Sequence, residues 1–280
     1  MKSKKHDIIA LIYDFDGTLA PGSMFEETLI PAFKMKSHKF WSLVDSLREK
    51  ERGDGTITFL RVLIETAAKK KVLVTKKVLE KYGTKISYFK GVGSYFTRIN
   101  KYLKVKYPGI ELRHYIISSG LKEILDGTKI AKYFHNIFGS EYHYGKNSKA
   151  DFPKTVINDT VKTQYIFRIS KDKESPEESV NTTVPAEERA VHIKNMIYIG
   201  DGFSDVPCMT VVHNSGGHSI AVYASGYKKG LAACRMLLKA ERVDFIAEAD
   251  YSEGSKLTRL IKQLIDGIVE EIRYSREKKR

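Results

Sequence analysis

The chain has 280 residues, of which 42% are hydrophobic and 29% charged, and its formal net charge at pH 7 is +14. Its two cysteines are too few for a disulfide framework, and no apolar run approaches the length of a membrane span, which excludes disulfide-rich secreted and membrane-spanning classes. We therefore predict a cytoplasmic protein with no membrane partner, built as one large domain or as a core with a smaller companion.

The first predicted element is a strand over Ile8–Tyr13, six residues that favour burial in a sheet. The strand runs directly into Asp14 and Asp16, followed by Gly17 and Thr18. Two carboxylates so close repel each other, and their desolvation is expensive unless something positive lies between them. Because residues two apart on an extended strand point the same way, both side chains can approach one small volume. The motif indicates a cation site, a proton-transfer site, or both.

The segment 21–112 is helical in pattern and strongly basic, with 19 lysines and arginines against 9 acidic residues. We interpret it as a helical cap inserted into an α/β core that comprises 1–20 and 113–280. Ligands of open α/β sheets bind at the carboxyl edge, where such an insert would lie. Its lysines are not interleaved with a repeated aromatic or arginine pattern, so nucleic acid is not an expected partner.

Later in the chain, apolar β-rich runs alternate with helical patterns. The runs are Glu111–Ser118, Asn136–Tyr142, Asn195–Gly200, Ser219–Tyr223 and Val243–Ala247. This alternation predicts an α/β fold with a Rossmann-like parallel sheet and helices on both faces. The polar segment 171–192 is predicted to be a long surface loop, and the apolar stripe from Leu257 to Ile272 a helix packed on the core.

A second acidic pair follows the predicted strand that ends at Gly200. Asp201 lies at the strand tip, and Asp205 comes four residues later, where a helix is expected to begin. Together with Asp14 and Asp16, these residues form an all-oxygen environment, which is the kind that Mg²⁺ prefers. The sequence therefore predicts a magnesium site at the ends of two apolar strands.

Two further parts would complete a site for a phosphorylated ligand. Ser118 and Ser119 end a predicted strand and Gly120 opens a helical pattern, which together offer a hydroxyl and backbone N–H groups to an anion. A lysine is also needed to balance the acids and the phosphate. Lys162, at the start of a strongly helical stretch, is preferred, and Lys154 is the alternative.

In this order, DFDGTL, SSG, a lysine and GDGFSD resemble the motifs of the haloacid dehalogenase-like (HAD) hydrolase superfamily, most closely its phosphoserine-phosphatase-like branch with a helical cap after the first motif. The resemblance covers nearly the whole chain. It implies a Rossmann-like core, dependence on Mg²⁺, and hydrolysis of a small phosphorylated metabolite through an aspartyl-phosphate, which makes the protein a phosphoric monoester hydrolase.

The resemblance also implies residue roles. Asp14 would be the nucleophile, Asp16 the general acid and then the general base, and Lys162 would orient Asp14 and offset negative charge. The implied phosphate-binding residues are Ser118, Ser119, Gly120 and Lys162. The implied Mg²⁺ ligands are Asp14, Asp16 through its backbone carbonyl, Asp201 and Asp205.

Two other functions stay open. A second acid is not needed for dehalogenation, and Phe15 stands where P-type ATPases have a lysine, so both chemistries are disfavoured. A phosphomutase keeps both aspartates and is one alternative. A basic polyanion-binding protein with a vestigial site is the other. The sequence specifies neither the natural substrate nor the oligomeric state.

Overall fold

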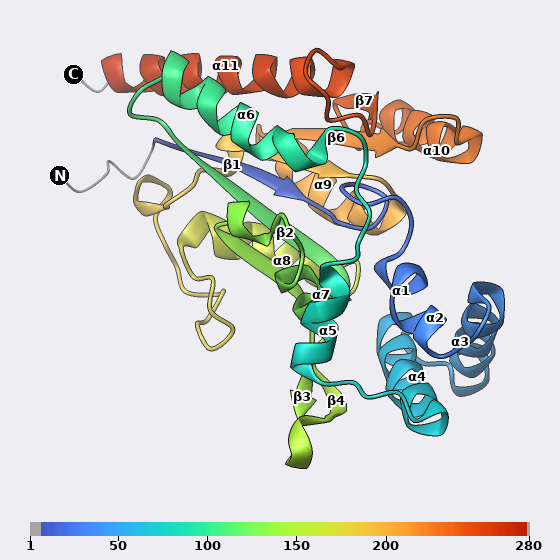
Figure 1. Ribbon diagram of the computed structural model, residues 1–280. Helices are drawn as coiled ribbons and strands as arrows, with labels where there is room; N and C mark the ends of the chain where they lie inside the picture. Colours follow the sequence, from blue (N-terminus) through green and yellow to red (C-terminus); the bar gives the residue numbers. More distant parts are fainter. Residues whose placement is uncertain (1–6, 279–280) are drawn as a thin grey trace.

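The computed structural model describes residues 7–278 and arranges them around a seven-stranded sheet with helices on both faces (Figure 1). The strand order is β4-β3-β2-β1-β5-β6-β7, and every neighbouring pair is parallel except β3 with β4. The strands are β1 (Ile8–Tyr13), β2 (Glu111–Leu121), β3 (Asn136–Tyr144), β4 (Ala150–Thr155), β5 (Met196–Gly200), β6 (His218–Tyr223) and β7 (Phe245–Glu248). The predicted α/β class with a Rossmann-like, mostly parallel sheet is confirmed.

All six predicted strands are present, and one further strand was missed. β1 has the predicted bounds, whereas β2 continues three residues beyond Ser118, as far as Leu121. The missed strand is β4, which is short, antiparallel and at the edge of the sheet, and it contains Pro153. Proline within a run argues against a central strand, and an edge position is where a sheet tolerates it.

Eleven α-helices occur in the described part of the chain. They are α1 (Met24–Glu27), α2 (Leu29–Ala32), α3 (Ser37–Glu51), α4 (Gly55–Lys70), α5 (Lys76–Gly83), α6 (Val92–Lys106), α7 (Lys122–Asp126), α8 (Val161–Lys171), α9 (Val206–Asn214), α10 (Lys228–Lys239) and α11 (Lys256–Glu277). No helix within residues 7–278 combines the length and the apolar character that crossing a bilayer would require.

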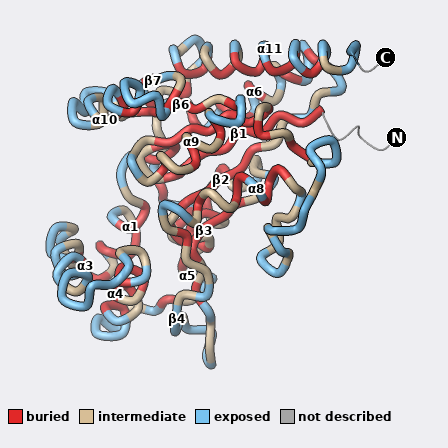
Figure 2. The backbone as a smooth tube through the Cα atoms, turned by 180° about the vertical axis from the view of Figure 1, so that it is seen from behind, coloured by how far each residue is buried: buried red, intermediate tan, exposed pale blue. Residues whose placement is uncertain are grey.

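The alternation of side chains along β1 divides the core into two layers. Ile9, Leu11 and Tyr13 belong to the layer that α6 and α11 cover, and the other three residues of β1 belong to the layer that α8 and α9 cover. Every residue of β1 is buried, as the backbone view coloured by burial also shows (Figure 2). A strand buried on both faces explains why its sequence is continuously apolar.

The segment predicted as a helical insert separates into two parts in space. Helices α1 to α4 form a lobe beyond the carboxyl ends of the central strands (Figure 1). By contrast, α6 packs on the sheet, where the rings of Tyr95 and Phe96 contact the ring of Tyr13. A hydrogen bond of 2.8 Å from Tyr142 Oη on β3 to the Leu60 carbonyl on α4 ties the lobe to the sheet. The exact boundaries of the insert stay a prediction.

Two other expectations are met in the later part of the chain. The predicted surface loop 171–192 begins one residue late, since Lys171 is the last residue of α8, and the structure places neither an α-helix nor a strand in 172–192. Arg168 on α8 holds this loop through hydrogen bonds to three backbone carbonyl groups, those of Lys173, Ser175 and Glu178. The apolar stripe from Leu257 to Ile272 lies on α11 and is buried against the sheet.

Candidate active site

The first acidic motif lies where the connections of the sheet change direction. β1 is flanked by β2 on one side and by β5 on the other. In open α/β sheets such a reversal leaves a crevice at the carboxyl ends of the strands, where ligands bind. Asp14 is the residue after β1, and its backbone N–H donates a 2.9 Å hydrogen bond to the Ile199 carbonyl of β5. This bond brings the ends of the two acid-bearing strands together.

Three of the four predicted metal ligands converge through their side chains. Asp14, Asp201 and Asp205 each present a carboxylate oxygen, and these oxygens lie within 4.8 Å of one another. The loop after Asp14 passes so close to Asp201 that a β-carbon on Gly17 would overlap its carboxylate. Gly17 also has a φ of +77°, which favours glycine. Close approach and backbone conformation therefore both require a glycine in this motif.

Lys162, and not Lys154, lies among these acids. Its Nζ is 2.8 Å from Asp14 Oδ1 and 2.8 Å from Asp205 Oδ1, and the side chain is almost fully buried. Burial opposes the positive charge, but the Asp14 and Asp205 carboxylates outweigh it and hold the pKa of Lys162 above its usual value. Lys154 is instead half exposed and pairs with Glu141 at the surface. The structure thus brings the preferred lysine to the site.

The two oxygens of Asp205 have different surroundings. Oδ1 accepts hydrogen bonds from Lys162 Nζ and from Tyr198 Oη, each 2.8 Å long. Oδ2 is buried and has no hydrogen-bond partner among the described residues. Sequence reasoning missed Tyr198, which it treated only as part of a buried strand. The signal was a hydroxyl in an otherwise apolar strand, two residues before the glycine of the second acidic motif.

The pKa values of Asp14 and Asp201 are raised, which indicates that the acid cluster contains too little positive charge to balance its carboxylates. Burial and the charge of Asp205 raise the pKa of Asp14 to about 6, although Lys162 acts in the opposite direction. Burial and the charges of Asp14 and Asp205 raise the pKa of Asp201 to about 8. One lysine cannot neutralise this group, and a divalent cation would. The all-carboxylate donor set and the unpartnered Asp205 Oδ2 fit Mg²⁺.

Asp16 lies beside this group but its side chain is outside the set of three converging carboxylates. Its Oδ1 accepts a 3.0 Å hydrogen bond from the backbone N–H of Met24, the first residue of α1. Burial and the neighbouring charge of Asp14 raise the pKa of Asp16 well above its usual value. A raised pKa favours the protonated form of a carboxyl group, which is the form that a general acid requires.

The serine motif, Ser118 to Gly120, is linked to Asp16 through Met24, whose side chain lies beside Gly120 and whose N–H bonds Asp16. A β-carbon on Gly120 would overlap the Met24 side chain and lie 3.2 Å from Ser118 Oγ. Ser118 is buried, and its Oγ accepts a 3.0 Å hydrogen bond from the Gly120 N–H. The predicted helix begins at Lys122, two residues later than expected, because β2 continues to Leu121. Ser119 accepts a hydrogen bond at its carbonyl from Ser140 Oγ.

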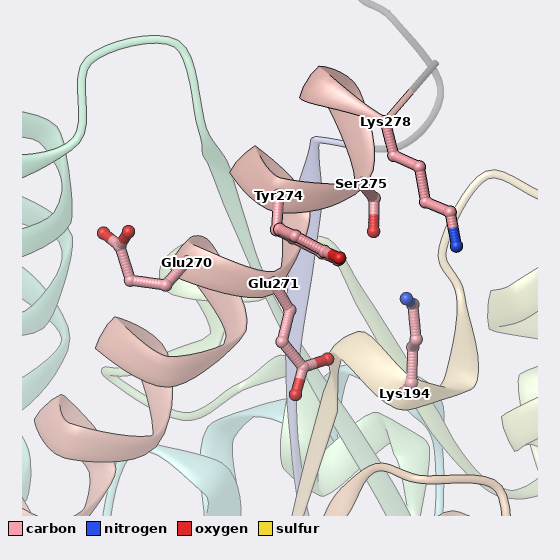
Figure 3. Close-up of a pocket in the computed structure, with 6 residues that line it drawn as sticks. All are labelled: Lys194, Glu270, Glu271, Tyr274, Ser275 and Lys278. Atoms are coloured by element: carbon pink, nitrogen blue, oxygen red, sulfur yellow. The ribbon is translucent and has the colours of Figure 1, made fainter.

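A hollow of about 590 Å³ lies at the opposite, amino edge of the sheet (Figure 3). It is lined by Lys194, Glu270, Glu271, Tyr274, Ser275 and Lys278. Lys194 precedes β5, and the other side chains come from the last turns of α11 and the residue that follows it. Charges of both signs line this hollow and are exposed or partly exposed, so it holds no buried group of like charges comparable with the acid cluster.

Comparison with known proteins shows which family the chain belongs to. No family model matches it. An uncharacterized protein from Borreliella burgdorferi is 30% identical to it over 293 residues, in an alignment that covers 94% of this chain and 98% of that protein. The chain belongs to the same family as this protein. Since that relative is itself uncharacterized, function has to be argued from the site.

Solved structures define the fold further. A HAD-family hydrolase from Salmonella enterica serovar Typhi matches 86% of this chain with a TM-score of 0.55 and 17% identity, and the match spans 66% of that longer protein. A phosphoserine phosphatase solved as a phospho-aspartyl intermediate analogue matches 92% of this chain, with 99% of its own length covered, a TM-score of 0.52 and 15% identity. The fold is that of HAD-like hydrolases, with phosphoserine phosphatases among its structural relatives, which confirms the fold that the motif resemblance implied.

Proposed function

We propose that this protein is a Mg²⁺-dependent phosphatase that hydrolyses a small phosphomonoester through a phosphoryl group carried by Asp14. The observation that carries the proposal is the buried bridge of Lys162 between Asp14 and Asp205, beside Asp201. Buried like charges persist in a fold when a bound partner compensates them. HAD-like phosphatases are among the structural relatives, and one was solved as a phospho-aspartyl analogue, which supports the same chemistry here.

The first step would transfer the phosphoryl group to the protein. A carboxylate oxygen of Asp14 attacks phosphorus, and the bond between phosphorus and the ester oxygen breaks. Asp16, whose raised pKa favours its protonated form, gives its proton to the departing oxygen. Lys162 holds Asp14 through Oδ1 and offsets the negative charge of nucleophile and phosphate.

The second step would release phosphate and restore Asp14. Asp16, now a carboxylate, accepts a proton from water as the water oxygen attacks phosphorus. The bond between phosphorus and Asp14 then breaks, which returns both carboxyl groups to their starting states. Ser118 and the backbone N–H of Ser119 or Gly120 are proposed to hold the phosphoryl oxygens, and in the second case the Gly120 N–H would exchange its bond to Ser118 Oγ for one to phosphate.

The proposed Mg²⁺ ligands in this chain are Asp14, Asp201, Asp205 and the backbone carbonyl of Asp16. When bound there, Mg²⁺ supplies positive charge that reduces the repulsion between carboxylate and phosphate. The lobe of α1 to α4 is proposed to act as a cap. It contacts the core at Asp16, through the Met24 N–H, and at Asn158, whose Nδ2 donates a 3.2 Å bond to Asp54 on the lobe. We expect the cap to select a small phosphorylated metabolite in the cytoplasm.

The test is phosphate release by the pure protein from a panel of small phosphomonoesters, with Mg²⁺ and with a chelator. We expect turnover that needs Mg²⁺ and falls by about 10³-fold or more in Asp14→Asn. The matched control is Asp266→Asn, since Asp266 lies on α11, bonds Tyr102, and is remote from the acid cluster; it should retain turnover. Acid quench during turnover should leave one added phosphoryl group on the peptide that contains Asp14.

Other results would point elsewhere. Transfer of phosphate between positions of one substrate, without release, would replace the phosphatase with a phosphomutase. No release from any ester, with polyanion binding that weakens steeply with salt and is unaffected by Asp14→Asn, would favour the polyanion-binding protein.

A further inference from the structure

Tyr198 is a fully buried tyrosine in the strand that leads to Asp201. The other residues of β5 are Met196, Ile197, Ile199 and Gly200, which carry no side-chain hydrogen-bonding hydroxyl or amide. The Tyr198 hydroxyl donates its hydrogen bond to Asp205 Oδ1 at 2.8 Å. A buried polar group of this kind is normally placed by its partner, and here the partner is a proposed metal ligand.

The backbone explains why these two side chains meet. Tyr198 and Gly200 are two residues apart on β5, so their α-carbon substituents point to the same face of the sheet. A β-carbon on Gly200 would overlap the carboxylate of Asp205. The Asp205 carboxylate therefore occupies the space that a side chain at position 200 would fill. This places its Oδ1 within reach of the Tyr198 hydroxyl.

Lys162 is one donor to Asp205 Oδ1, and the same ammonium group also bonds Asp14 Oδ1. The tyrosine adds a second donor to the same Asp205 oxygen. A neutral donor has a further advantage over a second lysine. It saturates Oδ1 without adding positive charge, which would repel a divalent cation from the site.

We propose that Tyr198 is a positioning residue that, together with Lys162, occupies Oδ1 of Asp205 and thereby leaves Oδ2 as the oxygen that binds the divalent cation. The inference rests on the proposed function, since it assumes a cation at the acid cluster. Its structural support is the asymmetry of Asp205: two donors contact Oδ1, and among the described residues none contacts the buried Oδ2. Partners of metal ligands orient those ligands and tune the affinity for the metal.

The test is calorimetric titration of the full-length, metal-free protein with Mg²⁺ alone. We expect Tyr198→Phe to raise the Kd for Mg²⁺ by about tenfold or more. The matched control is Tyr142→Phe, because Tyr142 is an equally buried tyrosine whose hydroxyl bonds the Leu60 carbonyl, away from the acids. That variant should bind Mg²⁺ with unchanged Kd, so a general effect of removing a buried hydroxyl is separated from a specific one.

A second pair of variants shows whether Tyr198 acts through Asp205. In Asp205→Asn, the further change Tyr198→Phe should leave the Kd for Mg²⁺ unaltered. A Tyr198→Phe protein that binds Mg²⁺ within about twofold of the wild type overturns the inference and leaves the proposed function standing. Wild-type protein that binds no Mg²⁺ overturns both. If Tyr198→Phe fails to fold, Tyr198→Met, which fills much of the same space and also removes the donor, replaces it and should bind Mg²⁺ more weakly than the wild type.

Discussion

The two edges of the same sheet carry charge in opposite ways. At the carboxyl edge, Asp14, Asp205 and Lys162 are buried and in direct contact, and the acids outnumber the lysine. At the amino edge, Lys194 and Glu270 belong to a hollow whose charged side chains reach solvent. Solvent screens the second set, so it is tolerated without a ligand, whereas the first set requires compensation. Burial of like charge, and not the size of a hollow, distinguishes the edge where we propose the active site.

The largest expected effect comes from removing the buried lysine that lies between the acids. Lys162→Met leaves Asp14 and Asp205 without their common partner, and should lower the free energy of unfolding of the metal-free protein by about 3–5 kcal/mol. Lys194→Met, at the amino edge, should change it by less than about 0.5 kcal/mol. Urea unfolding measures both values. Equal changes in the free energy of unfolding for the two variants would contradict the proposed difference between the two edges.

Substitution of glycine by alanine should lower the stability of the protein at Gly200 and raise it at Gly267. At Gly200 the new methyl group overlaps the Asp205 carboxylate, and we expect a loss of about 1–3 kcal/mol. At Gly267, an exposed position within α11 with open space around it, alanine should raise stability by about 0.5–1 kcal/mol. Thermal unfolding of both variants provides the measurement, and a stabilised Gly200→Ala protein would contradict the packing described above.

Smaller effects on stability and on the affinity for Mg²⁺ are expected from a change of pH. The pKa values of Asp14 and Asp201, about 6 and about 8, exceed those of unfolded aspartate. Between about pH 4 and pH 8, these two carboxyl groups therefore hold more protons in the folded metal-free protein than in the unfolded chain, and their contribution to stability falls as pH rises. Mg²⁺ must displace these protons, so its affinity should rise with pH by up to about tenfold per unit for each proton released. Calorimetry at pH 6, 7 and 8 tests this; a constant Kd would show that the acids are already ionised.

Much of the fold follows from local patterns that the sequence displays. The strand over Ile8–Tyr13 was predicted with its observed bounds, because a strand buried on both faces is continuously apolar and ends sharply at charged residues. β4 was not predicted, because its pairing with β3 depends on an edge position that no local pattern records. The start of α7 was misplaced by two residues for a similar reason, since β2 extends its pairing with β3 to Leu121.

Much of the candidate site was also visible, because its acids follow strands and parallel strands end at one edge. The choice between Lys154 and Lys162 was not decided by spacing, since the two are eight residues apart and both precede the second acidic motif. The packing of α8 against the sheet buries Lys162 between two carboxylates, whereas β4 leaves Lys154 at the surface. Tyr198 was missed because its partner, Asp205, is specified by the way the chain folds back over Gly200.

Residue types and their periodicity therefore specified the α/β class, the four aspartates and the expectation of a cation, because these depend on alternation along a strand and on the repulsion of neighbouring charges. Only the tertiary structure decided which lysine joins the acids and which oxygen of Asp205 remains unpartnered. Those properties depend on contacts between segments distant in sequence, and the packing of whole elements sets the distances and burial on which such contacts depend.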